Sequence, residues 1–336
     1  MKKINIILIL SIVSIVFIYF FNNNTSKNYK TKNVIVVVID GAEYSETWGD
    51  PDHKNIPFFS SIISKNGIVN TNFYNYGRTS TLCGFSALST GVYQRRCNND
   101  SQLSLIPSIF QSFLKSNQSL DSTKAWIIGS KRKLSVLANT QNKEWQDKYI
   151  PSINFITDTL DRVGQSRDDT LTLLNLFNVL DNFRPNLVLV GFKEPDVSGH
   201  SKDRDKYISE IRRTDRFIYD IWKYIHHDSF YSGTTTLFIT NDHGRHSNNI
   251  LSGFYNHGLC FKEDFKLSSY FFESWKIRGN SCKGCQHINF FAYGPDFKSG
   301  IIDIERELID IPTTIVELLQ IESDFVDGKI MHELFK

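Results

Sequence analysis

The chain has 336 residues, 40% of them hydrophobic and 22% charged, and a formal net charge of +2 at pH 7. This composition is typical of a globular protein and argues against disorder over most of the length. The small net charge, with no basic stripe of interleaved aromatic residues, argues against a nucleic-acid partner. The length suffices for one large α/β domain or two small ones.

Residues 1–21 predict a membrane anchor. Lys2 and Lys3 precede an apolar run over residues 4–21 that is interrupted by one asparagine and two serines. As a helix that rises about 1.5 Å per residue, this run can cross a hydrocarbon core of roughly 30 Å. No small-x-small cleavage motif follows it, which favours an uncleaved anchor over a signal peptide.

Residues 22–32 are expected to form a polar linker, and residues 33–336 to form the folded domain. An uncleaved anchor would hold this domain on the membrane outside the cytoplasm, in the periplasm or at the cell surface. Cleavage would instead give a secreted protein.

The domain alternates between strands and helices. Apolar, β-branched runs predict buried strands at residues 33–40, 124–130, 185–192, 234–240 and 288–295. Helical spacing of apolar residues predicts helices at 56–67, 84–94, 168–183, 205–227 and 311–321. This alternation predicts an α/β fold with a mostly parallel central sheet and helices on both faces. The long irregular segment 247–287 is expected to shape a substrate pocket.

Three predicted strands lead into metal-ligand residue types, which are Asp40, Asp196, His200, Asp242 and His243. Taken singly, a carboxylate after a strand is often a turn former or a helix cap. In a parallel sheet, however, ligands bind at the carboxyl ends of the strands. Three carboxylates gathered there would repel one another unless cations held them, so the pattern predicts divalent metal.

Mixed Asp and His ligands favour zinc, and they indicate manganese or iron less specifically. Five or six ligands exceed one tetrahedral site and fit two metals, which together stabilise an in-line displacement at phosphorus or sulfur. A nucleophile is also available, because Thr79, Ser80 and Thr81 precede a helix-like run whose N-terminus would cradle an anion. The alternative is that these hydroxyls cap the helix.

Five cysteines are present: Cys83, Cys97, Cys260, Cys282 and Cys285. The spacing "CKGC" at 282–285 is suggestive, yet one C-x-x-C without a second pair makes a poor zinc site. In an exported protein, a disulfide within this motif or from it to Cys260 explains the spacing at least as well. The odd count leaves one thiol unpaired or a pairing unassigned.

Five motifs in order resemble the alkaline phosphatase superfamily, and most closely its phosphodiesterase/nucleotide pyrophosphatase and sulfatase-like branch. They are Asp40-Gly, the Thr81 segment ending in "LSTGVY", "DVSGH", "DHG" and "FFAYGPDF". The resemblance covers nearly all of the chain after the anchor. It implies an alkaline-phosphatase-like fold and two divalent metal ions, Zn²⁺ in the first place and Mn²⁺ as the alternative.

The resemblance also implies roles for particular residues. One metal would be held by Asp40, Thr81, Asp242 and His243, and the other by Asp196, His200 and a further histidine. Counting back from the "TG" of the family pattern selects Thr81 as the nucleophile over Thr79 and Ser80, and implies a covalent phospho-enzyme intermediate.

The further histidine is expected to be His257, with His287 as the alternative. Gly84 stands where relatives often carry an asparagine that contacts phosphate, so it is the candidate substrate position. Arg245 and His246 are not needed by the scheme, and His246 is expected to lie in solvent, with contact to substrate as the alternative.

The leading hypothesis is a two-metal hydrolase of phosphoric esters that acts on a phosphodiester or nucleotide-like substrate. The substrate would be a small molecule or a lipid or glycan phosphoester. Because Thr81-Leu-Cys83-Gly-Phe85 lacks the C-x-P-x-R motif, a formylglycine sulfatase is disfavoured. The chain also has little room for the cap domain of a mutase. The alternatives are a phospho-headgroup transferase or sulfuric ester hydrolase of the same superfamily, and a metal-stabilised pseudoenzyme that serves as a surface binding module.

Overall fold

A computed structural model describes residues 28–94, 97, 102–155, 166–246, 253–258 and 282–336. The chain divides into two compact units, Met1–Lys30 and Thr31–Lys336, and the second is the folded domain. The predicted anchor at 1–21 lies outside the described residues. Among the helices that are described, none combines the length and the apolar character that a membrane crossing requires.

Within the described residues, the domain is built on an eight-stranded sheet with the order β5-β4-β6-β1-β7-β8-β2-β9. Its strands are β1 (Asn33–Ile39), β2 (Ile68–Asn70), β4 (Ala125–Gly129), β5 (Ser152–Asn154), β6 (Leu187–Phe192), β7 (Thr235–Asn241), β8 (Phe290–Tyr293) and β9 (Gly300–Ile302). β1 pairs in parallel with β6 and β7, whereas β8 runs antiparallel to β7 and β2. The predicted mostly parallel sheet is confirmed. β3 (Phe73–Tyr74) and β10 (Arg306–Glu307) form a separate parallel pair.

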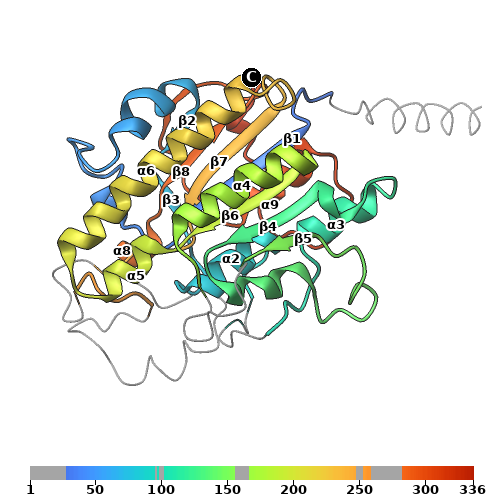
Figure 1. The fold of residues 1–336 in the computed structure, drawn as a ribbon, viewed down its shortest axis with the longest axis horizontal. Helices are drawn as coiled ribbons and strands as arrows, with labels where there is room; N and C mark the ends of the chain where they lie inside the picture. The colour runs from blue at the N-terminus through green and yellow to red at the C-terminus, as the bar shows by residue number, and fades with distance from the viewer. Residues whose placement is uncertain (1–27, 95–96, 98–101, 156–165, 247–252, 259–281) are drawn as a thin grey trace, which may run out of the picture. The chain divides into compact units, whose positions relative to one another are not determined.

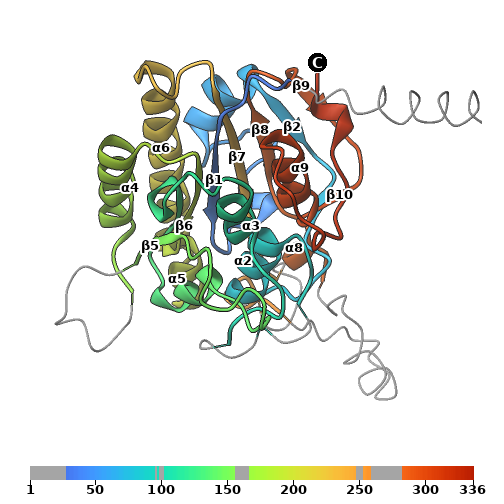
Figure 2. The ribbon, with the colours of Figure 1, turned by 90° about the vertical axis from the view of Figure 1, so that its right-hand side faces the viewer.

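Helices cover both faces of the sheet (Figures 1 and 2). On one face lie α4 (Asp169–Phe183) and α6 (Arg204–His227), and on the other lie α2 (Thr81–Thr90), α3 (Ile109–Ser116) and α9 (Asp310–Leu318). All seven residues of β1 are buried, as expected for a strand covered on both sides. The shorter helices are α5 (Glu194–His200), α8 (Lys283–Gln286), η1 (Tyr44–Glu46), η4 (Ser122–Lys124), η5 (Arg132–Ala138) and η6 (His332–Leu334).

The predicted helix at 56–67 is wrong in detail. The segment forms a π-helical turn, η2 (Phe59–Ile63), and a 3₁₀ turn, η3 (Ser64–Asn66), before β2. Its serine hydroxyls bond to backbone carbonyls one turn earlier, as Ser64 Oγ does to Ser60 O at 2.8 Å. Such bonds compete with the regular helical ladder and distort it. β2, β5 and β9 were not predicted, because three residues are too few to show a period.

Candidate metal centre

The predicted ligand residues emerge at one edge of the sheet. Ile39 of β1 is in register with Phe192 of β6 and with Asn241 of β7, so these three strands end side by side. Asp40 and Asp242 are the next residues along β1 and β7, while α5 begins two residues after β6. The backbone itself therefore brings the three segments together.

A first group consists of Asp40, Asp242 and His243, whose ligand atoms lie within 4.8 Å of one another. Nε2 of His243 lies 3.5 Å from Oδ1 of Asp40 and 3.4 Å from Oδ2 of Asp242. All three residues are buried. The structure thus gathers the three protein ligands that the resemblance assigns, with Thr81, to one metal.

Thr81 is the first residue of α2, and its Oγ1 lies 3.4 Å from Oδ1 of Asp40. Ser80 occupies the N-cap position of this helix but makes no side-chain capping hydrogen bond. The backbone carbonyl of Thr79 accepts a hydrogen bond from His257. Of the three candidate hydroxyls, that of Thr81 is hydrogen-bonded to a predicted metal ligand.

A second group consists of Asp196, His243 and His257, again within 4.8 Å. Asp196 and His200 lie one turn apart on α5, so both side chains leave the same face of the helix. Nε2 of His200 is 3.3 Å from Oδ1 of Asp196 and 3.0 Å from Nε2 of His257. The three residues expected at the second metal therefore adjoin one another.

The structure also separates the two alternatives for the last histidine. His257 Nε2 lies 3.5 Å from Oδ1 of Asp196. His287 instead bonds through Nε2 to the carbonyl of Thr71 at 2.8 Å and stacks on the rings of Tyr44 and Tyr74. His257 is therefore brought to the predicted ligands, and His287 is held in an aromatic stack.

These side chains fit a divalent metal. Among the described residues, the buried atoms Oδ2 of Asp242 and Nε2 of His243 have no hydrogen-bond partner. Burial lowers the pKa of His243 well below its ordinary value and that of His257 to about 4, so both imidazoles are neutral at pH 7, as metal ligands must be. Burial and the nearby Asp40 raise the pKa of Asp242. A bound cation would stabilise the ionised form.

Lys131 is part of the centre and was missed in the sequence. It follows β4, the parallel neighbour of β6, and its Nζ lies 2.7 Å from carboxylate oxygens of both Asp40 and Asp196. It also donates to Oγ1 of Thr81 at 3.1 Å. Burial would lower the pKa of Lys131, but the two carboxylates outweigh it and raise the pKa. The sequence does contain a signal for it, because Lys131 stands just past the end of a fourth predicted strand, as the acidic and histidine ligands do at the other three.

Arg245 and His246 depart from expectation. The Arg245 side chain is fully buried, and its Nη1 donates to Oδ1 of Asp196 at 2.8 Å while its other nitrogens donate to the carbonyls of Phe254 and Tyr255. Arg245 therefore orients a predicted metal ligand. His246 is only 2% exposed, so its expected place in solvent is wrong.

Gly84 has a packing role that accounts for the glycine. A Cβ added there would lie 2.5 Å from the carbonyl oxygen of Asp242, so the missing side chain lets α2 approach the loop after β7. Asn75 holds the same carbonyl with a hydrogen bond of 2.6 Å. The predicted substrate position is thus a contact between two elements of the centre.

The cysteines pair differently from the expectation. Cys83 and Cys97 form a disulfide, a pairing that the cysteine spacing did not predict. The sulfur atoms of Cys282 and Cys285 are 3.6 Å apart, so these two residues are not joined to each other by the disulfide that was one of the two expected pairings of "CKGC". Cys260 lies outside the described residues.

Solved structures of known proteins share this fold. Murine ectonucleotide pyrophosphatase/phosphodiesterase 5 superposes with a TM-score of 0.62 at 15% identity, over 90% of this chain and 100% of that one. A phosphonate monoester hydrolase from Silicibacter pomeroyi gives 0.57 at 12% identity, over 90% and 76%. The lipoteichoic acid synthase LtaP from Listeria monocytogenes gives 0.59 at 12% identity, over 88% and 73%. The predicted alkaline-phosphatase-like fold is confirmed.

In sequence, no curated protein matches the chain. The model of the type I phosphodiesterase / nucleotide pyrophosphatase family does match, over residues 108–285. This range is more than half of the chain and includes Asp196, His200, Asp242, His243 and His257, whereas Asp40 and Thr81 precede it. The chain belongs to the type I phosphodiesterase / nucleotide pyrophosphatase family.

Proposed function

We propose that the protein is a two-metal hydrolase of phosphoric esters, acting on a phosphodiester or nucleotide-like substrate with Thr81 as the nucleophile. Family membership and the superfamily neighbours support hydrolysis of a phosphoester or sulfate ester. The observation that carries the finer proposal is the position of Thr81 Oγ1, beside Asp40 at the N-terminus of α2. Among the neighbours, one structure contains AMP and another a neocarrahexaose.

Each metal has its own set of candidate ligands. Asp40, Asp242 and His243, together with Thr81, would hold the first, and Asp196, His200 and His257 would hold the second. Zinc is the proposed ion, with manganese as the alternative. Bound divalent metals would act as Lewis acids toward the phosphoryl oxygens and would lower the pKa of a coordinated hydroxyl.

The remaining chemistry belongs to the chain. Thr81 Oγ1 attacks phosphorus and its proton passes to Oδ1 of Asp40, 3.4 Å away. The bond from phosphorus to the leaving oxygen breaks, and that oxygen leaves as an alcohol after taking a proton from solvent. Lys131, 3.1 Å from Oγ1, offsets negative charge that develops on the phosphoryl group. Water then attacks the phosphoryl group that joins Thr81 to the retained alcohol, which releases a phosphate monoester and restores the Thr81 hydroxyl, and Asp40 returns its proton to solvent.

We also propose that residues 1–21 anchor the protein to a membrane, with the domain outside the cytoplasm. The disulfide between Cys83 and Cys97 supports this proposal, because such bonds persist in oxidising compartments. After an alkaline carbonate wash, the full chain should stay in the membrane fraction and be accessible to protease from the outer side. Recovery in the soluble cytoplasmic fraction would contradict the proposal.

The activity is tested with the full chain in mild detergent. After loading with Zn²⁺ or Mn²⁺, it should hydrolyse bis(p-nitrophenyl) phosphate, while Thr81→Ala should bind both metals at the centre and show no turnover. Mass spectrometry of the quenched wild-type enzyme should find a p-nitrophenyl phosphoryl group on Thr81, because the first step expels only one of the two p-nitrophenol groups. The same group on Thr79 or Ser80 would refute the nucleophile.

Other outcomes select the alternatives. Hydrolysis of p-nitrophenyl sulfate alone would identify a sulfuric ester hydrolase. Transfer of a phospho-headgroup to an added glycan or lipid acceptor in preference to water would identify a transferase. A fully metal-loaded chain that cleaves no member of a broad ester panel would favour a pseudoenzyme.

A further inference from the structure

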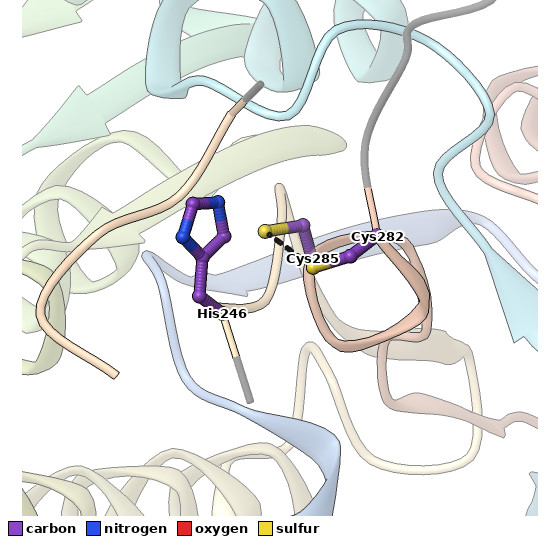
Figure 3. Close-up of side chains that lie close together, drawn as sticks. All are labelled: His246, Cys282 and Cys285. Carbon is purple, nitrogen blue, oxygen red and sulfur yellow. Dashed lines mark hydrogen bonds between the residues drawn. The ribbon is translucent and has the colours of Figure 1, made fainter. Parts of the chain in front are cut away.

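A second kind of ligand cluster lies beside the loop that follows β7. It consists of His246, Cys282 and Cys285, whose ligand atoms all lie within 4.8 Å of one another. The three residues are 2%, 6% and 0% exposed. Figure 3 shows the imidazole ring of His246 beside the two sulfur atoms, which project from a separate turn of the chain.

The backbone positions these side chains. In the turn of α8, the N–H groups of Cys285 and Gln286 both donate to the carbonyl of Cys282 at 3.0 Å, which places the two sulfurs on the same side. Gly244 donates to the carbonyl of Cys285 at 2.8 Å, and Arg245 donates to that of Gly284 at 3.1 Å. The segment that carries His246 is therefore tied directly to the segment that carries both cysteines.

Gly244 makes this approach possible. A Cβ at this position would lie 2.1 Å from the carbonyl oxygen of Gly284, a distance that real Cβ atoms do not show. The two segments could not come this close with any other residue at position 244. The close approach thus depends on the glycine at position 244.

From this geometry, we propose that His246, Cys282 and Cys285 bind one zinc ion, as a site separate from the two-metal centre. Two thiolates and one imidazole are the soft and borderline donors that zinc prefers. Three protein ligands leave one tetrahedral position for water or another ligand.

The histidine has the surroundings of a metal ligand. A hydrogen bond with the Gly258 backbone holds its ring, and Nε2 is buried from solvent. Metal-binding histidines are commonly held in this way, by a hydrogen bond to the ring nitrogen that does not bind the metal.

The ion would have a structural function. It would join the two ends of residues 247–281, because His246 precedes this segment and Cys282 follows it. His246 also lies three residues after His243, and Arg245 between them bonds to Asp196. The zinc ion would therefore stabilise the loop after β7, which carries the candidate ligands Asp242 and His243 of the two-metal centre. This inference stands whether or not the protein is a hydrolase.

The competing fate of the two cysteines is oxidation. A C-x-x-C pair in an oxidising compartment forms a disulfide unless a metal protects its thiols. Formation of that bond would join the two sulfurs and release two electrons to an oxidant. The zinc proposal requires instead that both thiols survive in the isolated protein.

Metal content provides the first test. The full chain, purified in mild detergent without chelator and saturated with Zn²⁺, should contain about three zinc ions, and Cys285→Ser about two. Lys283→Ala changes an exposed residue in the same turn and should keep all three, which makes it the matched control. An unchanged zinc content in a folded Cys285→Ser protein would overturn the proposal.

Cobalt distinguishes this site from the two-metal centre. Co²⁺ bound by thiolates gives a near-ultraviolet sulfur-to-metal charge-transfer band, which carboxylate and histidine ligands do not. The band should be present in wild type and in His257→Ala, and lost in Cys282→Ser. If His257→Ala loses metal from the two-metal centre but keeps this band, the proposed zinc site at His246, Cys282 and Cys285 is supported independently of the proposed hydrolase activity. Absence of the band from the cobalt-loaded wild type would overturn it.

A further measurement needs no variant. In the folded wild-type chain, a chelator should accelerate alkylation of Cys282 and Cys285 by at least about tenfold, because metal-bound thiolates are protected. Peptide mapping by mass spectrometry reports the two positions directly. Equal rates with and without chelator, or a disulfide between the two residues as isolated, would refute the site.

Discussion

Lys131 places a positive charge among the acidic residues of the centre, 2.7 Å from oxygens of Asp40 and Asp196 and 3.1 Å from the proposed nucleophile. A lysine so placed can hold the carboxylates apart and stabilise charge on a transferred phosphoryl group. Its side chain is 13% exposed, against 2% for that of Asp40 and 5% for that of Asp196. These contacts support a function of Lys131 in the proposed chemistry at Thr81.

Replacing this ammonium group should impair turnover. We expect Lys131→Met to lower kcat/KM for bis(p-nitrophenyl) phosphate by about 10²-fold, the cost of removing one fixed charge-stabilising donor. Lys143→Met, at an exposed position, is the control and should be neutral. A fall in metal content without a change in kcat for the loaded enzyme would show that Lys131 acts on the ligands alone.

His257 makes the stability of the metal-free protein depend on pH. Burial lowers its pKa from 6.5 to about 4, so between these values the unfolded chain binds a proton that the folded chain does not. The free energy of unfolding should therefore be highest above pH 6.5 and fall as the pH drops toward 4, by about 3 kcal/mol in all. Urea unfolding of the chelated protein measures this. In His257→Gln the free energy of unfolding should depend less steeply on pH between 4 and 6.5. Equal pH dependence in the two proteins would contradict the depressed pKa of His257.

At the level of elements, α2 is packed against the loop after β7 with no space for a side chain at Gly84. The contact fixes Thr81, in the first turn of α2, relative to Asp242 and thus to the first group of ligands. Asp196 lies on α5, and Arg245 holds its carboxylate through an ion pair. Two short helices therefore position the proposed nucleophile and the candidate ligands of the second group.

The packing of α2 can be tested with one methyl group. Gly84→Ala should displace the start of α2 from Asp242, because the added Cβ would lie 2.5 Å from a carbonyl oxygen. We expect a loss of about 1–3 kcal/mol in the free energy of unfolding and a larger relative loss of turnover. Ser86→Ala removes an atom from the same buried helix and serves as the control. Wild-type activity in a stable Gly84→Ala protein would contradict this role.

For the whole molecule, the disulfide between Cys83 and Cys97 joins α2 to the segment that follows it, over a separation of 14 residues. A cross-link over a loop of this length restricts the unfolded chain. Because Cys83 is two residues from Thr81, the bond also restrains the proposed nucleophile.

Removing the cross-link should destabilise the domain. We expect the double variant Cys83→Ala/Cys97→Ala to unfold with about 3 kcal/mol less free energy than the oxidised wild type. Denaturant unfolding measures the difference. A reductant should shift the unfolding midpoint of the wild type toward that of the double variant, and should leave the midpoint of the variant unchanged because it has no Cys83–Cys97 bond to reduce. Equal midpoints for oxidised and reduced wild type would contradict the expectation.

The sheet and most of the candidate centre were predictable from local patterns. Buried strands such as β1, β6 and β7 are continuous apolar runs, and the polar residues that end them are visible in the sequence. Because parallel strands end at one edge, Asp40 and Asp242 could be grouped before any coordinates were known. Helices α4 and α6 followed from their apolar spacing.

The remaining features depend on contacts between distant segments. Three contacts each join residues that no local period relates. They are the contact of His257, rather than His287, with Asp196, the insertion of Lys131 between two carboxylates, and the pairing of Cys83 with Cys97. His246 shows this most clearly. In the sequence it is one polar residue in a turn, and it becomes a candidate zinc ligand because the folded chain brings "CKGC" against it. Hydrophobic periodicity shows which face of a helix or strand is buried. A cluster of side chains depends instead on which distant segments the tertiary fold brings into contact.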